Sequence, residues 1–302
     1  MLRVQHLNCG CMCPLGGRLF DGVSHGPTAR LLCHCLLVES NDGLVLVDTG
    51  FGLGDVERPY ERLSPLFIHV NRIQFDRRET AAHQVEALGF RRSDVRHIVL
   101  THLDFDHAGG LEDFPRATVH VLADEMQAAR QRRSFLDRRR YRPQQWDEVG
   151  SWATYRRGEG ERWFGFEAVR DLKGLPPEIL FVPLPGHTLG HAGVAVETPE
   201  GWLFNAADAY FNRHEVDRPE RECPPAARAY QRMMAVDPDL HYENQERVRK
   251  LAHERPDIRI FCSHDPVEFE ALRRLSINEG RRRAPAQAGA PRSAVAAAPQ
   301  RQ

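Results

Sequence analysis

Residues 101–110 read THLDFDHAGG and directly follow a short apolar run that predicts a buried strand. In an extended segment alternate residues share a face, so His102, Asp104 and Asp106 can point the same way. His107 then points elsewhere, towards a second centre. Imidazole and carboxylate groups are the ligands that zinc, iron and manganese use in proteins. The stretch therefore predicts a metal-binding loop, with a charged surface loop as the alternative.

Three more ligand-type residues, His187, Asp208 and His264, each stand just after an apolar run. Strand ends gather at one edge of a sheet, so these loops and the first one can converge on a single site. Four such coincidences in one chain favour a shared metal site over an unrelated surface loop.

With these residues in place, the chain resembles the metallo-β-lactamase superfamily from about residue 31 to residue 268. The HxHxDH motif of that family falls on residues 102–107, its later ligands fall in order on His187, Asp208 and His264, and DTG at 48–50 resembles a family turn. The resemblance implies an α/β protein with an αββα sandwich and a dinuclear metal centre at one edge. By the same resemblance, one ion is bound by His102, Asp104 and His187. The other is bound by Asp106, His107 and His264, and Asp208 bridges the two.

Residues 103–110 and 263–265 are most similar to the N-acyl-homoserine-lactone lactonase branch of the superfamily. The implied activity is hydrolysis of a lactone, ester or thioester by a metal-bridging hydroxide, with Asp106 as ligand and proton shuttle. Members of that branch carry a tyrosine three residues after the bridging aspartate. Here that position is Phe211, and Tyr210 lies one residue earlier. Either the other metal ion or Tyr210 is therefore expected to stabilise the departing oxygen.

Asp104 departs from the family pattern, which usually has histidine there. If Asp104 binds metal, two divalent ions bring four positive charges against three aspartates, which favours the harder ions manganese or iron. The alternative is that Asp104 binds zinc as well as histidine would. The cofactor expectation is two divalent ions, zinc first, with manganese or iron as alternatives.

Other functions on the same fold stay open. A glyoxalase II-like thioesterase needs a basic patch for the glutathione carboxylate, and a persulfide dioxygenase uses a single iron, which leaves His107 and His264 little purpose. A non-catalytic sensor on this fold would not need plausible ligands at all seven positions. A nuclease needs a phosphate-binding surface. One cluster of arginines could supply it, although the usual role of such residues is a solvated helix face. The cluster consists of Arg130, Arg132, Arg133, Arg138, Arg139, Arg140 and Arg142.

The alternation of apolar runs and helical spacing predicts one α/β domain over residues 1–280. Residues 134–170 are rich in aromatic side chains and form either a substrate-covering insertion or a satellite core. Residues 281–302 are mostly Ala, Pro, Arg and Gln, which predicts a disordered tail. Strands are expected over residues 31–38, 44–47, 98–100, 118–122, 179–182, 192–196, 202–204 and 258–262. Helices are expected over residues 79–88, 123–133, 244–253 and 267–275.

The chain has 302 residues with 41 basic and 42 acidic side chains, a net charge of −1 that argues against a general nucleic-acid binder. It has no apolar stretch of membrane-spanning length and no signal peptide, so we expect a cytoplasmic protein. The resemblance to the lactonase branch implies a small substrate with an acyl or lactone group. Residues 63–68 carry apolar side chains for the substrate wall or a homodimer contact. Seven cysteines are expected to stay reduced. The CxC pairs within residues 9–13 and 33–35 are the candidates for an additional zinc site.

Overall fold

The computed structural model describes residues 2–158 and 160–283 of the chain. The larger sheet has seven strands in the order β4-β1-β2-β3-β5-β6-β7. Strands β3, β5, β6 and β7 run parallel to one another, whereas β1 and β2 form an antiparallel pair. Its strands are β1 (Arg3–Met12), β2 (Leu31–Ser40), β3 (Gly43–Val47), β4 (Ile73–Gln74), β5 (Val95–Val99), β6 (Thr118–Leu122) and β7 (Trp152–Tyr155).

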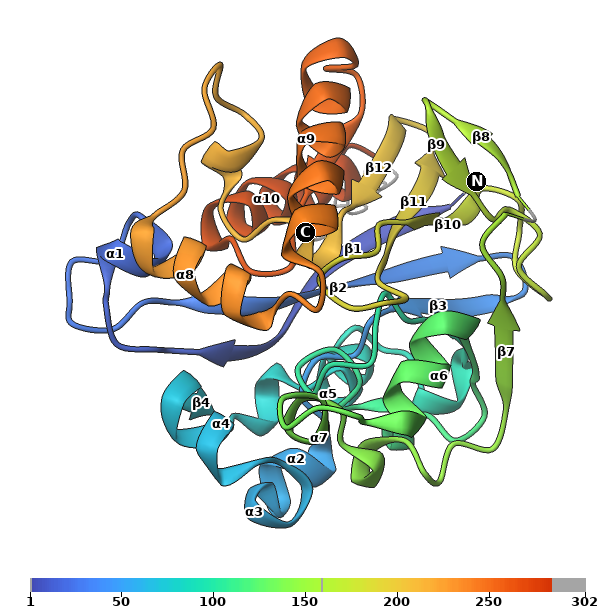
Figure 1. The fold of residues 1–302 in the computed structure, drawn as a ribbon. Helices are drawn as coiled ribbons and strands as arrows, with labels where there is room; N and C mark the ends of the chain where they lie inside the picture. Colours follow the sequence, from blue (N-terminus) through green and yellow to red (C-terminus); the bar gives the residue numbers. More distant parts are fainter. Residues whose placement is uncertain (1, 159, 284–302) are drawn as a thin grey trace, which may run out of the picture.

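The second sheet has four strands in the order β10-β11-β12-β13, of which only β12 and β13 pair in parallel. A separate antiparallel hairpin, β8 (Glu161–Trp163) and β9 (Phe166–Ala168), stands next to it in Figure 1. The strands of the second sheet are β10 (Ile179–Pro183), β11 (Ala192–Thr198), β12 (Gly201–Asn205) and β13 (Arg259–Phe261).

Helices cover the outer faces of both sheets, so the layers follow the order α, β, β, α (Figure 1). The helices are α1 (Arg18–Asp21), α2 (Leu53–Glu57), α3 (Pro59–Arg62), α4 (Pro65–Asn71), α5 (Ala81–Ala87), α6 (Ala123–Gln131), α7 (Asp137–Arg140), α8 (Pro225–Met234), α9 (Pro238–Glu254) and α10 (Pro266–Arg283). Short 3₁₀ turns lie at Arg77–Glu79, Arg92–Asp94, Leu111–Asp113, Pro143–Gln145, Ala207–Ala209 and Arg213–Glu215.

Three apolar cores hold these layers together. Between the sheets, side chains such as Val47 of β3 and Phe181 of β10 pack into one cluster. The outer face of the large sheet packs on α4, α5 and α6, and that of the small sheet packs on α9, where Val248 is fully buried. Because residues on both faces of the central strands are buried, those strands read as continuous apolar runs in the sequence. The αββα sandwich predicted from the sequence is confirmed.

Every strand and helix predicted from the sequence is present, with shifted ends. The largest shift is at the end of α10, which reaches Arg283 instead of residue 275. Helix α9 begins at Pro238 instead of residue 244, where Asp237 accepts a hydrogen bond from the main-chain nitrogen of Leu240 at 3.0 Å. Several elements were missed, among them the short helices α1 to α4 and strands β7 to β9. Strand β1 is rich in polar residues and cysteine, and helix α8 begins at Pro225 directly after Pro224, so neither has the usual sequence pattern. Helix α10 reaches Arg283, beyond the predicted domain end at residue 280. The rest of the predicted tail, residues 284–302, lies outside the described residues.

The aromatic side chains of residues 134–170 pack mainly into the cores. Tyr141 and Trp146 join the core of the large sheet, and Trp163 and Phe166 join that of the small sheet. Strand β7 from this segment extends the large sheet beside β6. A substrate-covering role for the segment stays a prediction. In the loop at 63–68, three of the four apolar side chains are also buried, and only Leu66 is exposed.

The cysteines behave as small core residues. All seven have free thiols, and Cys9, Cys33 and Cys35 lie in the core of the large sheet. Within residues 2–158 and 160–283, none of the side-chain groups close enough to hold a metal ion contains a cysteine. In the same part of the chain, no helix has the length and apolar character that a membrane span requires.

Candidate metal centre

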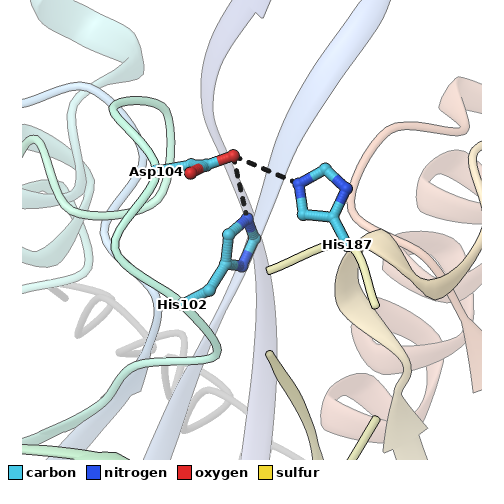
Figure 2. Close-up of side chains that lie close together, drawn as sticks. All are labelled: His102, Asp104 and His187. Atoms are coloured by element: carbon cyan, nitrogen blue, oxygen red, sulfur yellow. Dashed lines mark hydrogen bonds and ion pairs between the residues drawn. The ribbon is translucent and has the colours of Figure 1, made fainter. Parts of the chain in front are cut away.

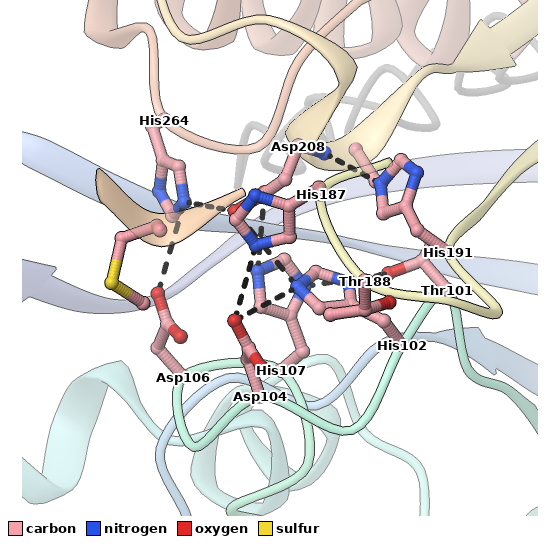
Figure 3. A network of polar contacts seen from close by, with 12 residues as sticks. Thr101, His102, Asp104, Asp106, His107, His187, Thr188, His191, Asp208 and His264 are labelled. Carbon is pink, nitrogen blue, oxygen red and sulfur yellow. Dashed lines mark hydrogen bonds and ion pairs between the residues drawn. The ribbon is translucent and has the colours of Figure 1, made fainter. Parts of the chain in front are cut away.

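The loops that follow five strands meet at one edge of the sandwich. The parallel pairs β3–β5 and β12–β13 end at this edge, and the loops after them carry Asp48, residues 101–107, Asp208 and His264. The turn after β10 brings His187 to the same place. All seven predicted ligand residues come together here and are at most 5% exposed (Figure 3). They form three overlapping groups with metal-binding spacing: His102, Asp104 and His187; His102, His107 and Asp208; Asp106, His107 and His264.

We call Asp106, His107 and His264 the second half of the site and His102, Asp104 and His187 the first half; Asp208 lies between the two. In the second half, Nε2 of His107 is 3.3 Å from Oδ1 of Asp208, and Nε2 of His264 is 3.2 Å from Oδ2 of Asp208. The same nitrogen of His264 is 3.7 Å from Oδ2 of Asp106. Ligand atoms around a tetrahedral zinc ion are about 3.4 Å apart. The spacing of the second half therefore fits a metal ion.

Asp48 and Thr101 orient two of the imidazoles. The carboxylate of Asp48 accepts hydrogen bonds from Nδ1 of His107 at 2.9 Å and from the hydroxyl of Thr101 at 2.8 Å. Because that hydroxyl donates to Asp48, its oxygen accepts from Nδ1 of His102 at 3.0 Å. Both rings thus carry their proton on Nδ1 and present the lone pair of Nε2 to the site. Neither Nε2 atom has another hydrogen-bond partner.

Two further histidines are set by main-chain carbonyl groups. Nδ1 of His264 donates to the carbonyl of Leu32 at 2.7 Å, which leaves Nε2 as the ligand atom. His191 was not predicted as a ligand, and it serves another purpose: its Nδ1 donates to the carbonyl of Leu184 at 2.8 Å and its Nε2 accepts from the main-chain nitrogen of Asp208 at 3.0 Å. His191 therefore fixes the backbone of the bridging aspartate.

Glu125 at the start of α6 ties two ligand loops together. Its carboxylate accepts from the main-chain nitrogen of Leu103 at 2.9 Å, from the hydroxyl of Thr188 at 2.6 Å and from the main-chain nitrogen of Gly190 at 3.1 Å. Glu125 is fully buried, and burial raises its pKa. Sequence analysis missed this residue, since a glutamate in the first turn of a helix is an ordinary surface residue.

The carboxylates make the site strongly attractive to positive charge. Burial alone would raise the pKa of Asp208, but three neighbouring imidazoles, with that of His264 first, hold it well below its usual range. Burial would lower the pKa of His107, but Asp208 and then Asp48 raise it well above the ordinary value. A cation is therefore favoured beside Asp208, which is what a divalent metal supplies.

The first half of the site contains a residue that sequence analysis placed elsewhere. Arg140, expected on a solvated helix face, is fully buried, and its guanidinium makes two hydrogen bonds to Asp104 at 2.7 and 2.6 Å. The same group lies 2.8 Å from Nε2 of His187. Figure 2 shows the carboxylate of Asp104 pointing towards both His102 and His187, from whose Nε2 atoms its Oδ2 atom is 3.6 and 3.1 Å away. Burial opposes the charge of Asp104, but Arg140 holds its pKa well below the usual range.

Tyr210 does not face the cluster. Its hydroxyl donates to Glu268 at 2.9 Å, and Tyr210 is fully buried. The geometry gives no support to the catalytic role predicted for it. Phe211 faces the site instead, with its ring 4.6 Å from that of His264. The ring of Tyr230, from α8, lies 6.0 Å from Phe211 and was missed because α8 itself was missed.

The residues present fit a metal ion in one half of the site better than in the other. In the second half, Nε2 of His107 and Oδ1 of Asp208 are buried without hydrogen-bond partners, which is the state expected of ligand atoms. In the first half, Nε2 of His102 is open in the same way, but both oxygens of Asp104 and Nε2 of His187 are engaged by Arg140. The second half therefore fits a divalent ion, and the first half does not fit one with Arg140 in place.

An αββα sandwich with buried histidines and aspartates at one edge defines the class of metal-dependent hydrolases built on this fold. The sequence pattern of the metallo-β-lactamase superfamily matches residues 28–264. The chain belongs to this superfamily.

Relatives agree with this assignment. A protein of Mycobacterium tuberculosis described as a probable metallo-hydrolase is 43% identical over 274 residues, which cover 90% of this chain and 83% of the relative. An N-acyl homoserine lactonase of Bacillus thuringiensis is 24% identical over 84% of this chain and 89% of its own length. A solved N-acyl homoserine lactone hydrolase with N-hexanoyl-L-homoserine at its catalytic metal centre has a TM-score of 0.65 at 20% identity and covers 89% of this chain and 95% of that one. At this identity, the structural likeness shows the fold alone.

Proposed function

We propose that this metallo-hydrolase cleaves a lactone or another ester bond in a small acyl compound. The observation that carries the proposal is the buried second half of the site, where oriented imidazoles and Asp208 leave ligand atoms open beside the carboxylate of Asp106. A divalent ion held there supplies the Lewis acidity that lowers the pKa of water and polarises a carbonyl oxygen. The similarity to lactonases over most of the chain supports the lactone as first choice.

The side chains around the ligands divide the remaining work. Asp106 is 5% exposed, the most exposed of the seven ligand residues, and we assign it the proton transfer to and from the reacting oxygen. His102 and His107 are held with their protons on the side away from the site, so they bind but do not donate. Tyr230 takes the place we first assigned to Tyr210. Burial and then Asp106 raise the pKa of its phenol, which stays protonated and can donate to a departing oxygen.

Apolar side chains beside the site support an acyl substrate. The main-chain nitrogen of Val236 donates to the carbonyl of His187 at 3.1 Å, and the side chain of Val236 is 42% exposed. Leu189, two residues after His187, and Met233, next to a carbonyl that Arg140 binds, are 51% and 56% exposed. Exposed apolar groups on the segments that hold a ligand suit the aliphatic part of a substrate.

The test is hydrolysis by the purified protein of N-acyl homoserine lactones, simple lactones, aryl esters and thioesters. We expect ester or lactone cleavage, and we expect Asp106→Asn to lower kcat at least 100-fold, because general acid–base catalysis contributes roughly 10²–10⁴-fold. Asp147→Asn is the matched control: this aspartate is exposed and lies outside the cluster, so its variant should keep full activity.

Full activity of the Asp106→Asn variant would refute the role of Asp106. Absence of activity on all ester and lactone substrates would refute the proposal, and oxygen uptake with a persulfide would replace it by an oxygenase. The nuclease alternative has lost part of its basis, because Arg140 is buried and Arg142 donates to the carbonyl of Arg62 at 2.7 Å. Zinc is the first expected metal, supported by a dizinc quorum-quenching lactonase of the same fold, with a TM-score of 0.59 at 17% identity over 88% of both chains. Manganese or iron, a cytoplasmic location and a homodimer stay predictions.

A further inference from the structure

Every N–H group of the Arg140 guanidinium has an acceptor inside the protein. Nε and Nη2 donate to the two oxygens of Asp104, and Nη2 also faces Nε2 of His187. Nη1 donates to the main-chain oxygens of Met234 at 2.8 Å and His187 at 3.2 Å. A guanidinium has five N–H groups in a fixed planar fork, and these contacts use all five. The surrounding chain is thus shaped around the guanidinium, which has no donor left for a substrate.

The same contacts occupy, as hydrogen-bond acceptors, the atoms that the first half of the site would offer to a metal ion. Both carboxylate oxygens of Asp104 accept from Arg140. Nε2 of His187 has a single lone pair, and that lone pair points at Nη2. The ligand atoms that stay open, Nε2 of His102, Nε2 of His107 and Oδ1 of Asp208, lie around Asp208 instead.

The charge of the site points the same way. Asp104, Asp106 and Asp208 bring three negative charges, and all three are buried. The guanidinium of Arg140 already lies against one of these carboxylates, that of Asp104, at 2.6 and 2.7 Å. Buried charge is tolerated where it is paired, so Asp104 does not need a metal ion as its counter-charge.

We propose that Arg140 takes the place of one metal ion, so that the protein holds a single divalent ion, bound by Asp106, His107, His264 and Asp208, beside a fixed guanidinium. Arg140 is a positioning residue in this arrangement: it holds Asp104 and His187 and supplies the positive charge that a second ion would otherwise supply. The inference rests on the proposed function, because it concerns the metal content of the same site.

The test counts metal ions per chain. The full-length protein is stripped, dialysed against excess zinc, passed over a desalting column and analysed by elemental mass spectrometry. We expect one equivalent in the wild-type protein and two in the double variant Asp104→His, Arg140→Met, which removes the guanidinium and supplies a third imidazole to the first half. Arg139→Met is the matched control, since Arg139 lies on the same helix and its guanidinium stacks over the ring of Phe135 at 3.2 Å, away from the ligands. It should bind one equivalent.

The outcomes separate this inference from the proposed function. Two equivalents in the wild-type protein would overturn the role of Arg140 and leave metal-dependent hydrolysis standing. Zero equivalents would overturn both proposals. One equivalent in a double variant that is folded by circular dichroism would show that the Arg140–Asp104 pair does not exclude the second ion, which overturns the inference. If the double variant does not fold, the wild-type count decides alone, because the two arrangements differ there by one full equivalent.

Discussion

Replacing Asp48 by asparagine changes the protonation of a ligand and leaves its position alone. Asp48 has a φ of +57°, a left-handed conformation that asparagine adopts as readily as aspartate. One oxygen of Asp48 accepts from the main-chain nitrogen of Thr101 at 2.8 Å, and asparagine keeps this contact through its own oxygen. Its NH₂ group must then face the hydroxyl of Thr101 and Nδ1 of His107, where the aspartate has an acceptor.

The consequence for His107 follows from its two nitrogens. An amide NH₂ donates, so Nδ1 of His107 can pair with it only as an acceptor, and the proton moves to Nε2. That nitrogen is the ligand atom of the second half, 3.3 Å from Asp208. Metal binding must then shift the proton back and break the new hydrogen bond. Loss of such an orienting carboxylate weakens metal binding about 10–100-fold, or about 1.4–2.7 kcal/mol.

Zinc affinity, measured by competition with a chromogenic chelator, checks this prediction. Asp21→Asn is the matched control: Asp21 is also a buried aspartate with several donors, among them the main-chain nitrogens of Ser24 and Arg30, but it does not contact a ligand residue. Its variant should bind zinc as the wild-type protein does. An Asp48→Asn variant with unchanged zinc affinity would refute the orientation of His107 argued here.

Two further predictions concern stability. Gly190→Ala should lower the free energy of unfolding by roughly 1–3 kcal/mol in a urea titration, because the added Cβ would lie 2.1 Å from the main-chain nitrogen of Glu125. The control is Gly150→Ala, whose added Cβ has no atom within 4 Å and should change this free energy by less than about 0.5 kcal/mol. Equal effects of the two variants would contradict the close packing of the loop at Gly190 on α6. Glu268 is half-buried, and loss of solvent around its carboxyl group raises its pKa from 4.5 to about 8. Between these two pH values the folded state holds a proton that the unfolded state loses. The free energy of unfolding of the wild-type protein should therefore fall as pH rises from about 4.5 to 8, by up to about 1.4 kcal/mol per pH unit. Glu268→Gln should remove this slope, and an unchanged slope in the variant would contradict the assignment to Glu268.

The sandwich and the clustering of the candidate ligand residues could be predicted because both depend on local patterns in the sequence. Strands buried on both faces appear as apolar runs, as residues 44–47 and 179–182 show. Each ligand stands within a few residues after such a run, so a list of strand ends already contains His187, Asp208 and His264. The structure brings all seven predicted ligand residues into one cluster.

The supporting residues could not be predicted because their partners are remote in the chain. Glu125 meets Gly190 across 65 positions, and Asp48 meets His107 across 59. No periodicity links such pairs. Tyr210 illustrates a second limit: the sequence places a phenol two residues after Asp208, but only the backbone of the 3₁₀ turn at Ala207–Ala209 decides that it points to Glu268 while Phe211 points to the ligands.

Arg140 also changes how residues 134–170 relate to the metal centre. If residues 134–170 only covered the substrate, they could vary or be deleted without any change to the metal centre. Yet Arg140 of α7 binds Asp104, His187 and the carbonyl of Met234, which lie 36, 47 and 94 positions away. Without Arg140, the buried carboxylate of Asp104 would lose its partner, and removal of one member of a buried ion pair costs about 3–5 kcal/mol. The segment is therefore an integral part of the centre, and a substitution in α7 that removes Arg140 would first alter the positions of Asp104 and His187 and only through them the binding of a substrate.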